Sequence, residues 1–201
     1  DAEEWVLENG AKVEFRKADY EKDQVQVASY SKGGTSLYDV DKLASAMVTD
    51  QFIGAYGLGD YDAITLRKLL TGKQAQAGVS ISGLSESVGG ASTPKDFETL
   101  MQLIYLRFEK PRFDKEVHQT MMQRNYAAIE NSGNNPQKIM QDSVSRIMSN
   151  YSPRTLSFGK EFLDKVSIEQ IEEIYRDRIK DISDFTFFIV GNIDAETVKP
   201  L

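Results

Sequence analysis

Cysteine is absent from this chain of 201 residues, and histidine and tryptophan occur once each. Without cysteine there are no disulfides, no thiolate ligands and no cysteine nucleophile, although the absence does not distinguish a reducing compartment from an oxidising one. Long apolar runs are also missing, since no stretch approaches the roughly 18 apolar residues of a membrane span. The start DAEEW has no apolar region of a signal peptide. We expect a soluble chain without a membrane span, whose signal peptide, if there is one, would lie upstream.

Basic residues are in the minority. Lysine and arginine number 24 against 31 aspartates and glutamates, which gives a net charge of −7, and the acidic residues are scattered along the chain. Nucleic-acid affinity depends on Lys and Arg displacing counterions, so nucleic acid is excluded as a partner. With 40% hydrophobic and 27% charged residues, the composition predicts one ordinary soluble domain over residues 1–201.

The C-terminal segment DFTFFIVGNIDAETVKPL, residues 184–201, predicts a strand followed by a short helix. An apolar run of strand length starts at Phe185, and Gly191 ends it. Asp194 is placed to cap a helix beginning at Ala195. Such a short helix is marginal by itself because helix nucleation is costly. We therefore expect the chain to be a fragment of a longer multidomain protein.

Several segments have the alternating or apolar pattern of strands. The turn Asn9-Gly10 between two apolar runs is a strong hairpin signal. The Gly and Ser rich segment 74–92 predicts two more strands joined by a turn near residues 83–86. The predicted strands are residues 5–7, 13–15 and 25–30, the two within 74–92, and the last strand from residue 185.

Helical periodicity predicts six longer helices, over residues 41–56, 63–70, 94–110, 114–130, 137–150 and 168–179. Thr93 before Pro94 and Ser167 before Ile168 have the composition of helix starts. The loop NSGNNP at residues 131–136 separates the fourth helix from the fifth. The residues at helical spacing in the first helix are Leu43, Ala44, Met47, Val48, Gln51 and Phe52, and those on one face of the second are Leu66, Leu69 and Leu70. The expected inner face of the fifth helix is Ile139, Met140, Val144, Ile147 and Met148.

Strands occur first, in the middle and last, with helices grouped between them. This order predicts the α+β class, with a mostly antiparallel sheet and helices packed on one face. Regular alternation of strand and helix is missing, so a doubly wound parallel sheet is disfavoured.

Four local sequences, in this order and spacing, resemble the M16 family of zinc metallopeptidases, the pitrilysin and insulinase group. They are WVLENGAKVEFRKAD at the start, GLGDYDAITLRKLLTGK from Gly57, KDFETLMQLIYLRFEKPRFDKE from Lys95, and the closing segment IYRDRIKDISDFTFFIVGNIDAETVKPL. Together they cover nearly the whole chain and look most like the long bacterial members. The resemblance implies an M16 peptidase domain of the LuxS/MPP-like fold.

Enzymes of this family close two related halves over a peptide, and the active half carries His-x-x-Glu-His on its first long helix. The two imidazoles bind one zinc ion, and the Glu acts as a base on the metal-bound water. Here the corresponding helix is 41–56, and the motif falls on Ala46, Thr49 and Asp50 in one register or on Val48, Gln51 and Phe52 in the other. Neither histidine nor glutamate occurs between Leu37 and Gly59. No catalytic, metal or cofactor residue is therefore transferred to this chain.

The degenerate motif fits the first domain of the C-terminal half, which keeps the fold of the family without its chemistry. The resemblance implies a non-catalytic structural domain that lines the peptide-enclosing chamber and packs against sister M16 domains of the same chain or of a partner subunit. Zinc and peptide cleavage would belong to the active half of the parent protein, with the motif several hundred residues upstream. Long bacterial members are often exported, which favours the periplasm.

The alternative function is a catalytically inactive M16-like scaffold or interaction subunit of a protein complex. It predicts that neither the parent protein nor a dedicated partner carries the zinc motif. An independent enzyme is the third interpretation, and it is disfavoured because no base, nucleophile and orienting group converge in the sequence.

Other residues could also bear chemistry. His118 is interpreted as a surface or helix-packing residue because a protein zinc site normally takes three or four ligands. The pairs Gly57-x-Gly59 and Gly72-Lys73 lack the rest of the dinucleotide and P-loop motifs, so they are interpreted as ends of helices. Asp39, Asp41, Asp60 and Asp62 resemble a cation site but are read as helix caps and dipole partners.

The segment GVSISGLSESVGGAST, residues 78–93, leaves two interpretations open. Small residues in a strand let another backbone approach, so an edge strand here could accept a peptide by main-chain pairing. The other interpretation, which the sequence favours, is a twisted hairpin with small residues where helices pack.

Overall fold

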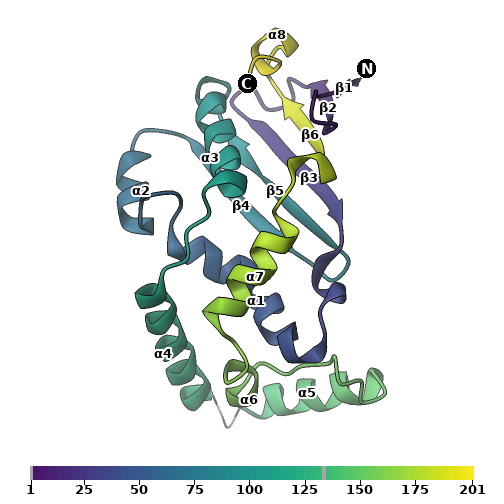
Figure 1. Cartoon of the computed structure of the whole chain (residues 1–201), viewed down its shortest axis with the longest axis vertical. Coiled ribbons are helices and arrows are strands. Elements are labelled where there is room, and N and C mark those ends of the chain that lie inside the picture. The colour runs from purple at the N-terminus through teal and green to yellow at the C-terminus, as the bar shows by residue number, and fades with distance from the viewer. Residues whose placement is uncertain (1, 133–134) are drawn as a thin grey trace.

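The computed structural model describes residues 2–132 and 135–201, and its centre is one six-stranded sheet (Figure 1). The strand order is β1-β2-β6-β3-β5-β4. The strands are β1 (Glu3–Val6), β2 (Lys12–Lys17), β3 (Val25–Lys32), β4 (Ala75–Ile81), β5 (Ser85–Ser92) and β6 (Thr186–Gly191). The pair β2 and β6 is parallel, and the other neighbours are antiparallel. The predicted α+β class with a mostly antiparallel sheet is confirmed.

The C-terminal strand enters the middle of the sheet. β6 pairs with β2 on one side and with β3 on the other, so Phe187 lies opposite both Val13 and Ser29. Strands from both ends of the chain thus share one sheet. The two predicted hairpins, β1 with β2 and β4 with β5, are confirmed by their antiparallel registers.

Eight α-helices are assigned among the described residues. They are α1 (Val40–Tyr56), α2 (Ala63–Leu69), α3 (Phe97–Glu109), α4 (Lys115–Ser132), α5 (Pro136–Met148), α6 (Lys160–Leu163), α7 (Ile168–Arg178) and α8 (Ala195–Val198). Short 3-10 turns cover Gly34–Leu37 (η1), Pro94–Asp96 (η2) and Ile182–Asp184 (η3). In Figure 1 α3 and α7 lie in front of the strands, and α1 runs behind α7.

The sheet has one covered face and one open face. In β3, Val25 and Val27 are buried, whereas Gln26 and Tyr30 are exposed. This alternation is what a sheet with helices on one face requires. On the open face the apolar residues Tyr30, Phe188 and Val190 keep 47%, 37% and 42% of their surface exposed.

Aromatic side chains join the helices above the covered face. Phe52 and Tyr56 of α1 are fully buried, and so is Tyr175 of α7. The Tyr175 hydroxyl donates a 2.7 Å hydrogen bond to the carbonyl of Arg107 in α3. A buried hydroxyl needs such a partner because desolvation without one costs free energy. The bond ties α7 to α3 across the core.

The predicted helix starts are largely confirmed. The Thr93 hydroxyl accepts from the amide of Asp96, and the Ser167 hydroxyl accepts from the amide of Gln170. Asp194 precedes α8 as expected but does not cap it with its side chain. Its carboxylate instead pairs with Lys17 at 2.5 Å.

The expected inner face of the fifth helix was wrong, and two other helices also expose residues that lie at helical spacing. In α1 Met47 is 46% exposed and Gln51 is also exposed, although the buried Val48 and Phe52 follow them directly in the helix. Helix α2 has no buried residue. Helix α5 has none either: its expected inner residues Ile139, Met140, Val144, Ile147 and Met148 are all exposed. Periodicity shows which side of a helix is apolar, but it does not show what that side contacts.

Two connections also differ from the expectations. The short helix α6 lies in a segment for which no helix was predicted. The helix expected to end at Glu130 continues to Ser132, so α4 takes up the start of the predicted loop 131–136. Residues 133 and 134 of that loop lie outside the described residues. Every helix of the described residues is too short or too polar to cross a membrane.

Candidate functional site

Helix α1 occupies the place where the resemblance puts a zinc motif, and its side chains there belong to the core. In one register Ala46 is 1% exposed and Thr49 is 0% exposed, and the Thr49 hydroxyl donates to the carbonyl of Ser45 at 2.8 Å. In the other register Val48 is 5% exposed and Phe52 is 0% exposed. Each register therefore places two of its three positions inside the packed structure.

The residues at these positions do not fit zinc. Proteins bind zinc through thiolate, imidazole and carboxylate groups. Asp50 supplies the only such group in either register, and its Oδ1 accepts from the amide of Gln51 at 2.7 Å. Across the described residues, no three His, Cys, Asp or Glu side chains are grouped so as to hold a metal ion. We derive no hydrolytic step for this helix.

His118 is a packing residue of α4, in agreement with its interpretation from the sequence. The side chain is 9% exposed, and its Nδ1 lies 2.8 Å from the hydroxyl of Tyr56 in α1. Its ring is 5.2 Å from that of Phe52. Burial lowers the pKa of His118 and raises that of Tyr56, with nearby Glu169 opposing the shift of the histidine. A neutral imidazole that accepts the phenol proton suits this pocket.

Acidification should weaken the packing of α4 on α1. The folded pKa of His118 lies below the unfolded value of 6.5, so the unfolded chain binds more protons as the pH falls through 6.5. We expect the free energy of unfolding to drop more between pH 7 and pH 5.5 in the unsubstituted chain than in His118→Gln, by at most about 1 kcal/mol, since one proton contributes about 1.4 kcal/mol per pH unit. Urea titrations at both pH values measure the difference. Equal losses in the two proteins would contradict this account.

The glycines and aspartates singled out in the sequence serve local structure. Gly57 ends α1 with φ at +94°, and a Cβ there would meet the carbonyl oxygen of Tyr61 at 2.2 Å. Asp62 caps α2 by accepting from the amide of Thr65 at 2.8 Å. Asp60 pairs with Lys110 at 2.7 Å. Asp39 precedes α1 without a side-chain cap bond, and Asp41 lies in the first turn of that helix.

The small-residue segment 78–93 lies in the hairpin β4 and β5. A Cβ at Gly90 would lie 1.9 Å from the carbonyl oxygen of Gln76 in the neighbouring strand. The backbone that comes close is thus β4 itself, which supports the hairpin interpretation. β4 is the last strand of the described sheet, and Arg107 of α3 donates to the carbonyl of Ala77 at 3.2 Å. A buried arginine thus occupies one main-chain acceptor of this edge strand.

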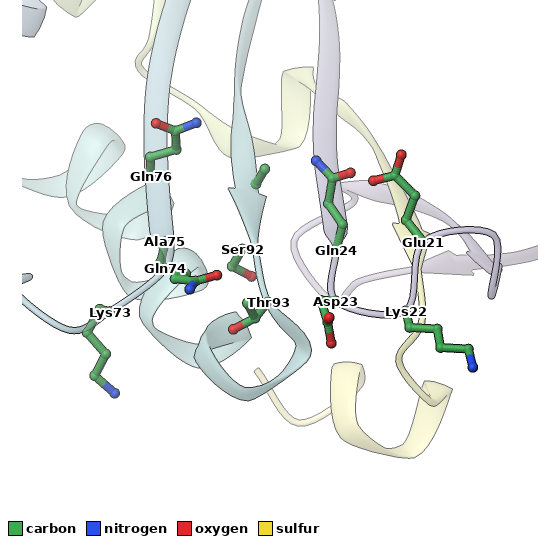
Figure 2. Close-up of a pocket in the computed structure, with 11 residues that line it drawn as sticks. Glu21, Lys22, Asp23, Gln24, Lys73, Gln74, Ala75, Gln76, Ser92 and Thr93 are labelled. Carbon is green, nitrogen blue, oxygen red and sulfur yellow. The ribbon is translucent and has the colours of Figure 1, made fainter.

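A hollow of about 650 Å³ opens beside the ends of β3, β4 and β5 (Figure 2). Its charged residues are Glu21 and Asp23 against Lys22 and Lys73, so their charges balance. Figure 2 shows both lysine side chains extending away from the glutamines that line the strands. Balanced charge of this kind does not select an anion or a cation. Its lining residues can form hydrogen bonds with a polar peptide segment, but they do not include a nucleophile and base arranged for catalysis.

Sequence reasoning missed a buried carboxylate. Glu86 of β5 is 2% exposed and accepts from the Ser31 hydroxyl at 3.0 Å and from the amide of Gly34 at 2.6 Å. The guanidinium of Arg178 lies 3.8 Å away. The cluster thereby holds η1 against the sheet and α7. One signal was available: Glu86 and Val88 share a face in the strand alternation, so the glutamate had to point inward with the valine.

The fold and the missing metal ligands together define a class, a domain with the fold of M16 peptidases that lacks the zinc motif of the active half. No family model matches the chain. It is 24% identical to "Probable zinc protease PqqL" of Haemophilus influenzae over 212 aligned residues, which cover 100% of this chain and 22% of that relative. The chain thus spans about a fifth of the length of the curated relative it matches.

Solved structures agree in fold. The periplasmic protease PqqL from Escherichia coli superposes with a TM-score of 0.83 at 16% identity, over 99% of this chain and 22% of that one. A peptidase M16 inactive domain from Pseudomonas fluorescens superposes with a TM-score of 0.76 at 17% identity, over 100% of this chain and 48% of that one. The predicted resemblance to M16 peptidases and the predicted fold are confirmed.

Proposed function

We propose that this chain is one M16-like domain, residues 1–201, of a longer zinc-dependent metalloendopeptidase. It serves there as a non-catalytic structural domain that forms part of the wall of the peptide-enclosing chamber. Its place is the first domain of the C-terminal half. Zinc and the hydrolytic residues lie in the active half, outside these residues.

The observation that carries the proposal is the burial at α1. A helix that held zinc would present its ligands to substrate, whereas Thr49 and Phe52 are fully buried. This helix therefore stabilises a domain rather than forming a catalytic centre. The length of the relatives supports the placement of this domain in a longer peptidase, because the chain covers only 22% of each of the two PqqL proteases.

The open face of the sheet is the surface we assign to the chamber. Its residues include the small residues Ala28, Gly78 and Gly89, with Phe188 and Tyr30 beside them. Such a surface is suited to contact with extended peptides without binding one sequence tightly. The partners are sister M16 domains and the peptide substrate, and we place the protein in the periplasm, as the Escherichia coli relative is described.

The test compares the chain with the longer polypeptide that carries it. We expect about one zinc ion per molecule and cleavage of a quenched fluorescent peptide from the longer polypeptide, and neither from the 201-residue chain. Zinc content is measured by mass spectrometry after dialysis against a weak chelator. Stoichiometric zinc with turnover in the 201-residue chain would overturn the proposal.

A scaffold or interaction subunit is the second candidate, and the exposed apolar side of α5 favours it. It predicts that the longer polypeptide contains no His-x-x-Glu-His motif and that no dedicated partner does. A longer polypeptide without zinc, and without a zinc-bearing partner after gentle purification, would decide for this function.

A further inference from the structure

Helix α5 carries its apolar side on the outside of the molecule. Five apolar residues of this helix keep between 43% and 83% of their surface exposed: Ile139, Met140, Val144, Ile147 and Met148. We call these five residues the α5 stripe. In Figure 1 the helix lies below the sheet at the edge of the molecule. Soluble monomers rarely expose contiguous apolar patches of more than a few hundred Å², and larger ones mark interaction sites.

The polar side of α5 is the better covered side. Lys138, Asp142 and Ser145 are half-buried, and Lys138 pairs with Asp142 at 2.5 Å. At about 100° per residue, Met140 and Ile147 lie roughly 160–180° from Lys138 around the helix axis. The helix is therefore oriented opposite to an ordinary surface helix, whose apolar side packs on its own core.

The helix is capped at its start, and the segment that follows its end is tied to the rest of the domain. At its start the Asn135 side chain accepts from the amide of Gln137 at 3.0 Å. Beyond its end Arg154 donates to the carbonyls of Tyr38 at 2.7 Å and Thr35 at 3.0 Å, next to α1. The exposed stripe thus belongs to an anchored element, which reduces the entropy lost when a partner binds.

We propose that the α5 stripe docks against another domain of the same longer polypeptide, an inference that rests on the proposed function. The matched region covers only 22% of the two protease relatives, so about four fifths of such a polypeptide lies outside it. A domain joined through the same chain is present at high effective concentration. The partner surface is an apolar groove that accepts one side of a helix, here the side chains at i, i+4, i+7 and i+8 counted from Met140.

Charge argues against a membrane as the occupant. Helices that lie on membranes are rich in Lys and Arg on their polar side. The charged residues of α5 are Lys138, Arg146 and Asp142, and the chain as a whole has a net charge of −7. Repulsion from anionic lipids would oppose binding to a membrane. An apolar protein surface does not repel the acidic chain in this way.

The absence of cysteine provides a direct test, since a single cysteine can be introduced without background from this chain. Ile147→Cys probes the stripe, and Ile64→Cys on α2 is the matched control, because the two isoleucines are 62% and 66% exposed on helices without buried residues. In the 201-residue chain both cysteines should react with a maleimide at similar rates. In the longer polypeptide Ile147→Cys should react at least tenfold more slowly relative to Ile64→Cys, after subtraction of labelling in the unsubstituted protein.

A second variant tests the docking energetically. Ile147→Glu should lower the thermal midpoint of the longer polypeptide and leave that of the 201-residue chain unchanged, because a charge is tolerated at an exposed position but not in an apolar groove. Ile64→Glu should change neither midpoint. A tenfold protection of Ile147→Cys together with this pattern supports the inference.

Other outcomes would overturn it. Unchanged labelling of Ile147→Cys in the longer polypeptide shows that no domain covers the stripe. A 201-residue chain that sediments as a dimer and becomes monomeric on Ile147→Glu assigns the stripe to a second copy. Cosedimentation of the chain with vesicles of anionic phospholipid assigns it to a membrane. Labelling does not depend on zinc, so protection without peptidase activity would reject only the proposed function.

Discussion

The combined substitutions Ala46→His, Thr49→Glu and Asp50→His are expected to unfold the chain rather than to create a zinc site. These three substitutions introduce His-x-x-Glu-His into α1 at positions 46 to 50, the first of the two possible registers. Ala46 contacts the buried core around Ile81 and Ile174, and Thr49 is fully buried. Overpacking costs about 1–3 kcal/mol, and an unpaired buried carboxylate costs several more. The total is comparable to the whole stability of a domain, roughly 5–15 kcal/mol.

Circular dichroism and zinc titration separate the possible results. We expect loss of the cooperative thermal transition, and no recovery of it when zinc is added. Asp50→His alone is the control: Asp50 is only half-buried, so its replacement should change the free energy of unfolding by less than about 1 kcal/mol. A folded triple variant that binds zinc would show that these positions can open toward solvent, contrary to the packing described for α1.

Removal of the buried carboxylate in Glu86→Ala should destabilise the chain by about 3 kcal/mol. The substitution leaves the Ser31 hydroxyl and the Gly34 amide without their acceptor, and hydrogen bonds to a charged group are worth about 1.5–3 kcal/mol each. Arg178 loses less because Asp177 lies 3.0 Å from its guanidinium. Urea unfolding followed by tryptophan fluorescence and circular dichroism measures the loss.

Two variants make the interpretation specific. Glu86→Gln keeps the shape and one acceptor oxygen, so it should recover about half of the lost stability. Glu14→Ala removes an exposed glutamate from β2, which β6 and β3 separate from β5, and it should stay within about 0.5 kcal/mol of the unsubstituted chain. If Glu86→Ala were as stable as Glu14→Ala, the carboxylate would not hold η1 against the sheet.

Much of the fold follows from local signals that do not depend on distant contacts. The Asn9-Gly10 turn, the caps at Thr93 and Ser167 and the apolar strand from Phe185 each act within a few residues, and the structure contains the elements they predict. The pairing of β6 between β2 and β3 is different in kind. It joins residues more than 150 positions apart, and a periodic pattern within one strand does not show which other strand it pairs with.

At the candidate site, too, some properties can be read from the sequence and others only from the tertiary structure. The lack of histidine and glutamate between Leu37 and Gly59 can be read directly from the sequence, because a ligand that is not encoded cannot be supplied by folding. That Thr49 and Phe52 are buried could not be read from it. Helical spacing also groups Met47 and Gln51 with the buried Phe52, although both are exposed.

The sequence by itself determined the order of the strands and the longer helices, the caps at Thr93 and Ser167 and the chemical groups that α1 can offer, since these depend on residue type and short spacing. Only the tertiary structure decided which apolar sides are covered. The α5 stripe is as periodic as a core-facing helix, yet it faces outward. Burial depends on what packs against a surface, and for α5 we propose that the packing surface lies in another domain.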